Sequence, residues 1–455
     1  MLTFLRPIIT WILLHSFYFG GIVTGISSIF FKAEFGLYLS VALIPLPNLW
    51  YKLYEFPFGK DVIDFLIISV LIGIFVNKKG FVKSQSSILL MVFILLSYVS
   101  VWNVSMNFSL PIPITTDNPT LKMWKAYCVM ILLYFLSLNA IEDEKRQKIL
   151  VILMVGVVLL ISIKSNRDFI AGSSFVDESR DPGPFWIVGL GSNHFGAFIS
   201  YCFSFILGLF FLDKDKKRRL LYMATLALSF HPLFFSYSRG AYAAIFCTLA
   251  FYGLIRKRAL LIAVVMVVLL WESVLPVTVV ERIKMTETAS GEIESSAAAR
   301  FRLWEEARSM FNQYPVFGSG FNGFTLAHKG EHWSDTHNFY VKTLCEQGII
   351  GSILLALVLL AAFRSGWKLF KNGKSNFQKG IGFGFLGCLI SQVVVNMFGD
   401  RWSYYEMGSY FWVIWGLVDR GLIISENARL VKEEQIINEI LPSEQRTDLF
   451  QTFSS

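Results

Sequence analysis

Residues 87–103 read SILLMVFILLSYVSVWN, a run without a charged side chain that approaches the length of a membrane-spanning helix. A second such run, ALLIAVVMVVLLW, occupies residues 259–271. Across all 455 residues, 54% of the side chains are hydrophobic, 16% are charged and 43 are phenylalanine. Soluble domains carry roughly 25% charged residues, and a water-soluble fold could not bury this much apolar surface. The sequence therefore predicts an all-α, polytopic helical membrane protein.

Hydropathy predicts where these helices cross the membrane. We expect spans near residues 60–76, 87–103, 121–140, 149–163, 186–212, 220–236, 240–255, 260–278, 339–363, 380–398 and 406–423. Residues 8–50 hold either one long broken span or two short ones, which brings the total to about 12. The chain thus divides into an amino-terminal bundle (1–278), one large loop (279–338), carboxy-terminal helices (339–424) and a polar tail (425–455).

Basic residues are distributed unevenly between alternate connections, and this asymmetry predicts the orientation. One set holds Lys78, Lys79, Lys83, Lys145, Arg146, Lys148, Lys214, Lys216, Lys217, Arg218, Arg219, Arg256, Lys257, Arg258, Arg364, Lys368, Lys371, Lys374 and Lys379. The other set holds only Lys52, Lys60, Lys164, Arg167, Arg180, Arg239 and Arg401. Because cytoplasmic loops are enriched in Lys and Arg, we place the first set and the tail in the cytoplasm and the large loop outside.

Arg239 is the only formally charged residue between Leu220 and Ile255. It follows Ser238 at the point where an outward span meets an inward one. An arginine at such a boundary can extend its side chain to the lipid headgroups. Alternatively, its planar guanidinium faces a cavity open to the outer leaflet and binds phosphate oxygens in a bidentate manner.

The large loop contains a predicted helix that begins after Ser295 and Ser296, which are good helix caps. Arg300 and Trp304 are four residues apart and share one face of this helix. Arg302 can pair with Glu305 or Glu306, which is typical of a solvated surface. Arg300 has no acidic residue at these spacings, so its charge is a candidate for an anionic ligand, although a structural role is the alternative.

Three glycines, Gly318, Gly320 and Gly323, follow this helix and predict a turn whose backbone amides could approach an anion. The segment does not follow a strand, so it is a weak phosphate-binding motif. His337 and Asn338 come directly before the apolar run that begins at Phe339. A histidine at the outer mouth of a span is a candidate general base, although a structural histidine is more common at such a position.

Metal, disulfide and nucleotide signatures do not occur in the sequence. Cys128, Cys202, Cys247, Cys345 and Cys388 are scattered singly, which predicts neither a disulfide framework nor a thiolate site. His328 and His332 are four residues apart but lack a third ligand at helical spacing, so we expect no metal site. Walker and Rossmann motifs are absent. We therefore expect no cofactor, no nucleotide-driven chemistry and no nucleic-acid partner.

Five short motifs follow one another along the chain: Ser238-Arg239-Gly240-Ala241, Arg300-x-x-x-Trp304, Pro315-x-x-Gly318-x-Gly320, His337-Asn338-x-Tyr340 and Glu346-x-Gly348-Ile349-Ile350-Gly351. In this order they resemble the O-antigen ligase and polymerase superfamily of bacterial membrane glycan transferases. The resemblance covers roughly residues 190–365; the amino-terminal half is matched only by its pattern of hydrophobic spans.

This resemblance implies a glycosyltransferase of the bacterial inner membrane whose active site faces the periplasm. Such an enzyme transfers a glycan from undecaprenyl diphosphate to an acceptor hydroxyl, with inversion and without a metal. By analogy with the family, Arg239 and Arg300 hold the diphosphate and His337 activates the acceptor. Arg302, Arg180 and Asn338 are secondary candidates.

The acceptor separates three activities within the superfamily. A ligase transfers finished polymer to the lipid A-core of lipopolysaccharide, a polymerase transfers the growing chain to the next lipid-linked repeat, and a protein glycosylase uses serine or threonine. Arg180 and Gly191 fit an R-x10-G pattern described for polymerases, but with 33 glycines in 455 residues about one arginine in fourteen would match by chance. We favour the ligase. A flippase or other transporter is less consistent with the sequence because no internal repeat is visible.

Overall fold

The computed structural model describes residues 2–57, 59–77, 80–168, 180–284, 295–329 and 335–440, and within them it contains helices and no strand. The first half comprises α1 (Leu2–Phe30), α2 (Glu34–Leu43), α3 (Pro47–Trp50), η1 (Tyr51–Glu55), η2 (Gly59–Asp61), α4 (Val62–Val76), α5 (Gln85–Asn107), α6 (Pro119–Ala140), α7 (Glu144–Asp168), η4 (Gly183–Val188) and α8 (Ser192–Leu212). The second half comprises α9 (Lys216–Phe235), α10 (Arg239–Ile255), α11 (Arg258–Val274), α12 (Val277–Lys284), α13 (Ser295–Gln313), α14 (Gly323–Ala327), α15 (Phe339–Asn372), α16 (Asn376–Val395) and α17 (Tyr405–Ile440). The predicted all-α class is confirmed.

Seven of these helices are long and apolar enough to cross a membrane: α5, α6, α7, α8, α15, α16 and the Ile12–Phe30 part of α1. Counting the bent pair α11 and α12 as one span, with its 90° bend, gives up to eight. The three shorter apolar helices α2, α4 and α10 have only 10, 15 and 17 residues. The predicted total of about 12 spans is therefore not confirmed. Residues 8–50 form two principal helices, α1 and α2, separated at Lys32.

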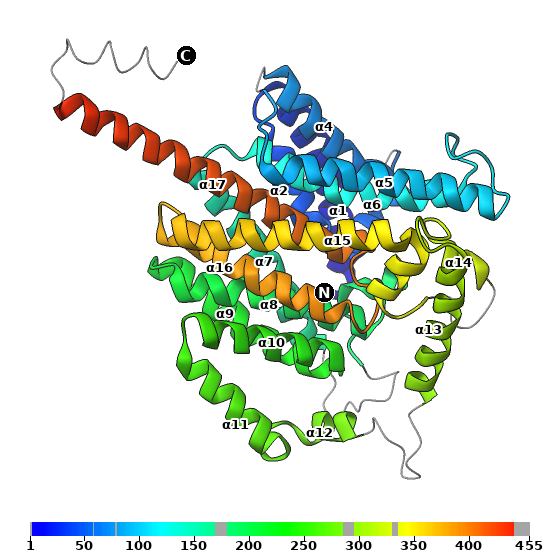
Figure 1. The fold of residues 1–455 in the computed structure, drawn as a ribbon. Coiled ribbons are helices and arrows are strands. Elements are labelled where there is room, and N and C mark those ends of the chain that lie inside the picture. Colours follow the sequence, from blue (N-terminus) through cyan, green and yellow to red (C-terminus); the bar gives the residue numbers. More distant parts are fainter. Residues whose placement is uncertain are drawn as a thin grey trace.

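Helices α8 and α16 form the centre of the bundle, and α16 also packs against α10 and α15 (Figure 1). Their backbones come very close: a Cβ atom at Gly208 would lie 2.3 Å from the Cα atom of Gly384. Tyr252 of α10 donates a hydrogen bond of 2.7 Å to the carbonyl of Ser204. Small residues allow this close packing where lipid supplies no hydrophobic drive for association.

The glycine segment after α13 packs into a break in α15. Gly348 interrupts α15 with a φ of 64° and a ψ of −164°. The amides of Ser319 and Gly320 donate to the carbonyls of Cys345 and Glu346, each at 2.9 Å. Of the three predicted glycine amides, that of Gly320 thus bonds to α15, whereas those of Gly318 and Gly323 bond to the carbonyls of Tyr314 and Gly320. The amides of Ser319 and Gly320 join two segments of the backbone.

Helix α13 lies at the end of the bundle where α15 begins, next to α14 (Figure 1). Its Leu303 and Ala307 pack against Phe324 and Cys345 in a small apolar cluster. Trp304 also donates a hydrogen bond of 2.9 Å from its indole nitrogen to the carbonyl of Thr336. This bond ties α13 to the segment that carries His337.

Candidate functional site

A cavity of about 330 Å³ opens at the amino-terminal end of α10. Its lining includes four arginines that come from four different segments of the chain. They are Arg239 at the start of α10, Arg282 of α12, Arg300 of α13 and Arg401 of the connection between α16 and α17. No acidic side chain from the described ranges lines this cavity. The arrangement is strongly cationic and suits an anion that carries several charges.

Arg239 is the first residue of α10, and its neighbours also line the cavity. Ser238 caps the helix, with its hydroxyl oxygen accepting from the amide of Ala241. Tyr237 precedes the cap with a φ of 49°, an uncommon left-handed conformation for a bulky residue. The positive end of the helix dipole therefore points toward the same cavity as the guanidinium groups.

Arg300 and Arg302 lie on different faces of α13, as their spacing predicts. Arg300 lines the cavity. The side chain of Arg302 is 61% exposed, and its Nε lies 3.6 Å from a carboxylate oxygen of Glu306. Arg302 is thus a surface residue outside the cavity, in agreement with the solvated face expected for it.

Arg180 lies beside the cavity and links two of the segments that form it. Its guanidinium donates to the carbonyl of Ser236, at 3.1 Å from Nε and 2.9 Å from Nη2. It also donates to the side-chain oxygen of Asn193 at 2.8 Å. Asn193 lines the cavity, whereas Arg180 does not. Arg180 therefore helps to position the cavity wall through its hydrogen bonds to Asn193 and Ser236.

His337 lies next to the cavity, at the amino-terminal end of α15. Its φ of 52° is left-handed, and its Nδ1 is 3.8 Å from a carboxylate oxygen of Asp335. Burial lowers the pKa of His337; the carboxylate of Asp335 opposes this shift, and the charges of Arg300 and Arg401 add to it. The imidazole is therefore neutral at pH 7 and can accept a proton.

Asn338 caps α15. Its side-chain oxygen accepts hydrogen bonds from the amides of Tyr340 at 3.0 Å and Val341 at 3.2 Å. This oxygen is thus engaged in holding the first turn of the helix. The cap fixes the direction in which the backbone leaves His337.

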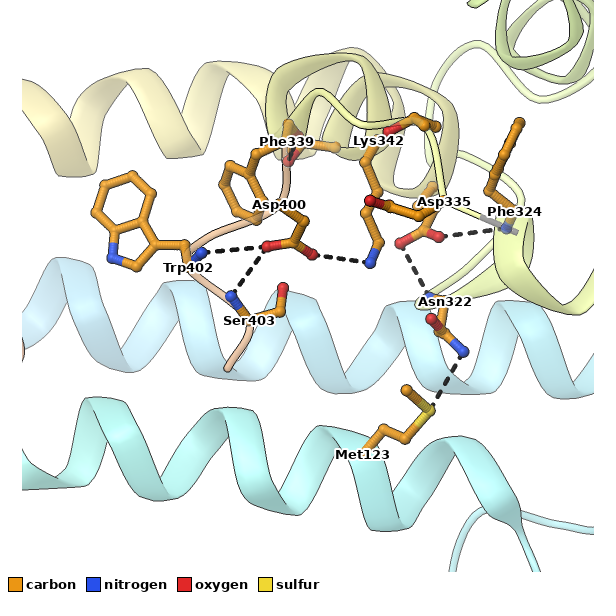
Figure 2. Close-up of polar contacts among 12 residues, drawn as sticks. Met123, Asn322, Phe324, Asp335, Phe339, Lys342, Asp400, Trp402 and Ser403 are labelled. Carbon is orange, nitrogen blue, oxygen red and sulfur yellow. Dashed lines mark hydrogen bonds and ion pairs between the residues drawn. The ribbon is translucent and has the colours of Figure 1, made fainter. Parts of the chain in front are cut away.

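Arg401, like Arg282, lines the cavity although its sequence pattern did not single it out. It is only 7% exposed, and its Nη1 donates to Nε2 of His194 at 2.6 Å. The preceding residue, Asp400, anchors the connection. Figure 2 shows its carboxylate between the ammonium group of Lys342, at 2.9 Å, and the backbone amides of Trp402 and Ser403.

Sequence signals for Arg401 and His194 were present but weak. Asp400 and Arg401 form a charged pair in a short connection directly after an apolar helix, and many such pairs merely mark the end of a span. His194 begins an apolar helix and has no ligand spacing to another histidine. Their contact joins residues 207 positions apart, which no local pattern reveals.

In the histidine pair considered for a metal, His328 has two polar contacts. Nε2 of His328 lies 3.0 Å from a carboxylate oxygen of Glu306, and its Nδ1 lies 2.8 Å from the carbonyl of Phe324. His332 falls outside the described residues. Among the residues that are described, no group of three or more His, Cys, Asp or Glu side chains could hold a metal ion.

Comparison with known proteins agrees with the resemblance seen in the sequence. Residues 224–356 match the family model described as O-antigen ligase. No curated protein matches the chain. The matched segment includes Arg239, Arg300, His337 and Asn338, whereas Arg180, His194 and Arg401 lie outside it. The predicted relationship to the O-antigen ligase and polymerase superfamily is thereby confirmed.

Proposed function

Because residues 224–356 match the O-antigen ligase family model, we propose that the protein is an O-antigen ligase-type glycosyltransferase. The proposed donor is a glycan linked to undecaprenyl diphosphate, and the proposed acceptor is a hydroxyl of lipid A-core. The reaction takes place on the periplasmic face of the bacterial inner membrane. The observation that carries this proposal is the convergence of Arg239, Arg300 and Arg401 on one cavity beside His337.

In this proposal the cavity binds the diphosphate of the donor. Two phosphates present several oxygens in different directions, and guanidinium groups from separate segments can each bind one side. The amino-terminal end of α10 adds backbone dipoles of the same sign. These fixed charges stabilise the negative charge that grows on the leaving oxygen as the bond to the anomeric carbon breaks.

His337 then acts as the general base. Its neutral imidazole accepts the proton of the acceptor hydroxyl while that oxygen forms the new bond to the anomeric carbon. The electron pair of the broken glycosidic bond leaves with the diphosphate, so a single displacement inverts the anomeric centre. Asp335 stabilises the imidazolium that forms, because its carboxylate lies 3.8 Å from Nδ1.

No step of this mechanism consumes a nucleotide or assigns a role to a metal. The lipid diphosphate is itself an activated leaving group, and the arginines supply the positive charge. The expected partners are therefore the lipid-linked glycan, the acceptor and the surrounding lipids.

A polymerase of the same superfamily would use the same donor cavity and differ in the acceptor. Deleting the gene and analysing surface and lipid-linked glycans tests this choice. For a ligase, long polymer accumulates on undecaprenyl diphosphate while lipid A-core stays bare. Acceptors capped with single repeats would instead identify a polymerase, and unchanged glycans on every carrier would contradict both.

A further inference from the structure

A second and larger cavity, of about 1030 Å³, lies at the opposite end of α15 from the arginine cavity. It is formed by the start of α5, the second half of α15 and the middle of α17. Phe339 begins α15 near the candidate site, and Arg364 lines the second cavity. At 1.5 Å per residue, the unbroken part of α15 from Gly348 to Arg364 alone spans about 24 Å. In Figure 1, α17 leaves the bundle here and projects beyond the other helices.

The lining changes from apolar to basic in the same direction along two helices. On α15 it runs through Leu357, Leu360 and Ala361 to Arg364 and Lys368. On α17 it begins at Asp419 and runs through Leu422, Ile423 and Glu426 to Arg429 and Lys432. Spacings of three and four residues keep each series on one helical face. The apolar part lies toward the middle of the bundle and the basic part toward its end. The cavity is therefore amphipathic along the direction expected of the membrane normal.

The basic part carries a surplus of positive charge. Its lining holds six basic side chains, Lys83, Arg364, Lys368, Lys374, Arg429 and Lys432, against two acidic ones, Asp419 and Glu426. Within the described part of the chain, only Arg429 among the six has a carboxylate within 4.0 Å, namely Glu433 at 3.6 Å. Asp419 accepts a hydrogen bond of 2.6 Å from the hydroxyl of Tyr134. Most of the positive charge is thus available to a ligand.

We propose that this cavity binds an anionic phospholipid of the cytoplasmic leaflet, with the phosphate among the basic side chains and the acyl chains against the leucines. A free phosphate or another small anion would use only the basic part. The apolar lining is the observation that favours a lipid, because it continues from the charged part along the same helical faces. The site is separate from the donor cavity, so it does not depend on the proposed glycosyl transfer.

Lipid titration of the purified, delipidated protein tests this proposal. Binding of phosphatidylglycerol and of zwitterionic phosphatidylcholine is measured by native mass spectrometry. We expect phosphatidylglycerol to bind at least tenfold more tightly than phosphatidylcholine. Each basic residue near a lipid headgroup is worth about fivefold in affinity. Arg364→Gln/Lys368→Gln should therefore lower phosphatidylglycerol affinity by at least about tenfold.

Lys216→Gln/Lys217→Gln is the matched control. It removes the same charge from exposed residues of α9 that do not line the cavity, so phosphatidylglycerol affinity should stay within about twofold. If Arg364→Gln/Lys368→Gln does not fold, Arg429→Gln/Lys432→Gln on α17 makes the same test. Equal affinity in the cavity variant and the control would overturn the proposal. So would binding of sn-glycerol 3-phosphate as tight as that of the intact lipid, which would identify a soluble anion as the ligand.

Discussion

Arg401 donates a hydrogen bond of 2.6 Å to Nε2 of His194, and this contact joins the start of α8 to the connection between α16 and α17. Since Nε2 accepts, the imidazole carries its proton on Nδ1 and is neutral. The bond directs the guanidinium of Arg401, a residue that is only 7% exposed, into the wall of the cavity that the four arginines line. Arg401 thus provides a fixed positive charge from a segment outside the O-antigen ligase match at residues 224–356.

Replacing Arg401 should impair donor binding and shift the pH dependence of the reaction. We expect Arg401→Ala to weaken donor binding by about tenfold or more, because a charged hydrogen bond is worth about 1.5–3 kcal/mol. Since Arg401 lowers the pKa of His337, the acidic limb of the rate profile should move to higher pH. Transfer rates measured against donor concentration and pH give both quantities. A wild-type donor affinity would exclude Arg401 from the diphosphate site.

The pH profile of the unmodified protein reports the protonation of His337. Burial lowers the pKa of this group below its ordinary value of 6.5, so the neutral, active form persists below pH 6.5. The transfer rate should fall only as the pH drops through this lowered value. Asp335→Asn removes the charge that raises the pKa, so the acidic limb should move to still lower pH. If Asp335→Asn leaves the acidic limb of the rate profile unchanged, a group other than His337 controls that limb.

The junction of the glycine segment with α15 should be sensitive to a single methyl group. A Cβ atom at Gly348 would lie 2.3 Å from the carbonyl oxygen of Val316, and the φ of Gly348 is 64°. We expect Gly348→Ala to lower the stability by more than about 1 kcal/mol. Gly156→Ala in α7 is the control, since no atom lies within 4 Å of its added Cβ, and it should be neutral or slightly stabilising. Equal melting temperatures of the two variants would contradict the described junction.

The orientation of the chain in the membrane can be measured by labelling single cysteines with an impermeant maleimide in intact cells. In a background without native cysteines, Glu305→Cys on α13 should be labelled. Lys216→Cys and Lys371→Cys should not, because they belong to the basic set expected in the cytoplasm. All three positions are exposed, which makes them suitable for the reagent. Labelling of Lys371→Cys without labelling of Glu305→Cys would invert the orientation.

The helices follow from the sequence because long apolar runs leave few alternatives in a membrane. Arg239 also stands out, since a lone arginine between two apolar runs needs a reason to be there. The number of spans does not follow as directly. Helices such as α4 and α10 are apolar but have only 15 and 17 residues, so length and composition alone do not decide whether they cross.

Contacts between distant segments could not be predicted from one sequence. The amide of Gly320 bonds to the carbonyl of Glu346, a backbone contact that side-chain patterns do not encode. For the same reason the three glycines suggested an anion-binding turn, whereas the amide of Gly320 in fact bonds to α15 and those of Gly318 and Gly323 bond to carbonyls of their own segment. His194 and Arg401 meet only because α8 and α16 pack together. Periodicity identifies helices, whereas the site depends on which helix ends come together.

The transfer rate of the purified protein in vesicles, with undecaprenyl diphosphate-linked glycan and acceptor, tests the proposed diphosphate site most directly. We expect Arg239→Ala and Arg300→Ala to lower this rate by about 100-fold or more. His337→Ala should retain less than about a tenth of the wild-type transfer rate. Arg302→Ala, the control on the exposed face of α13, should stay close to wild type because exposed ion pairs contribute at most about 1 kcal/mol. The wild-type rate should persist in EDTA and without ATP. Wild-type transfer by folded Arg300→Ala would contradict the proposed position of the diphosphate.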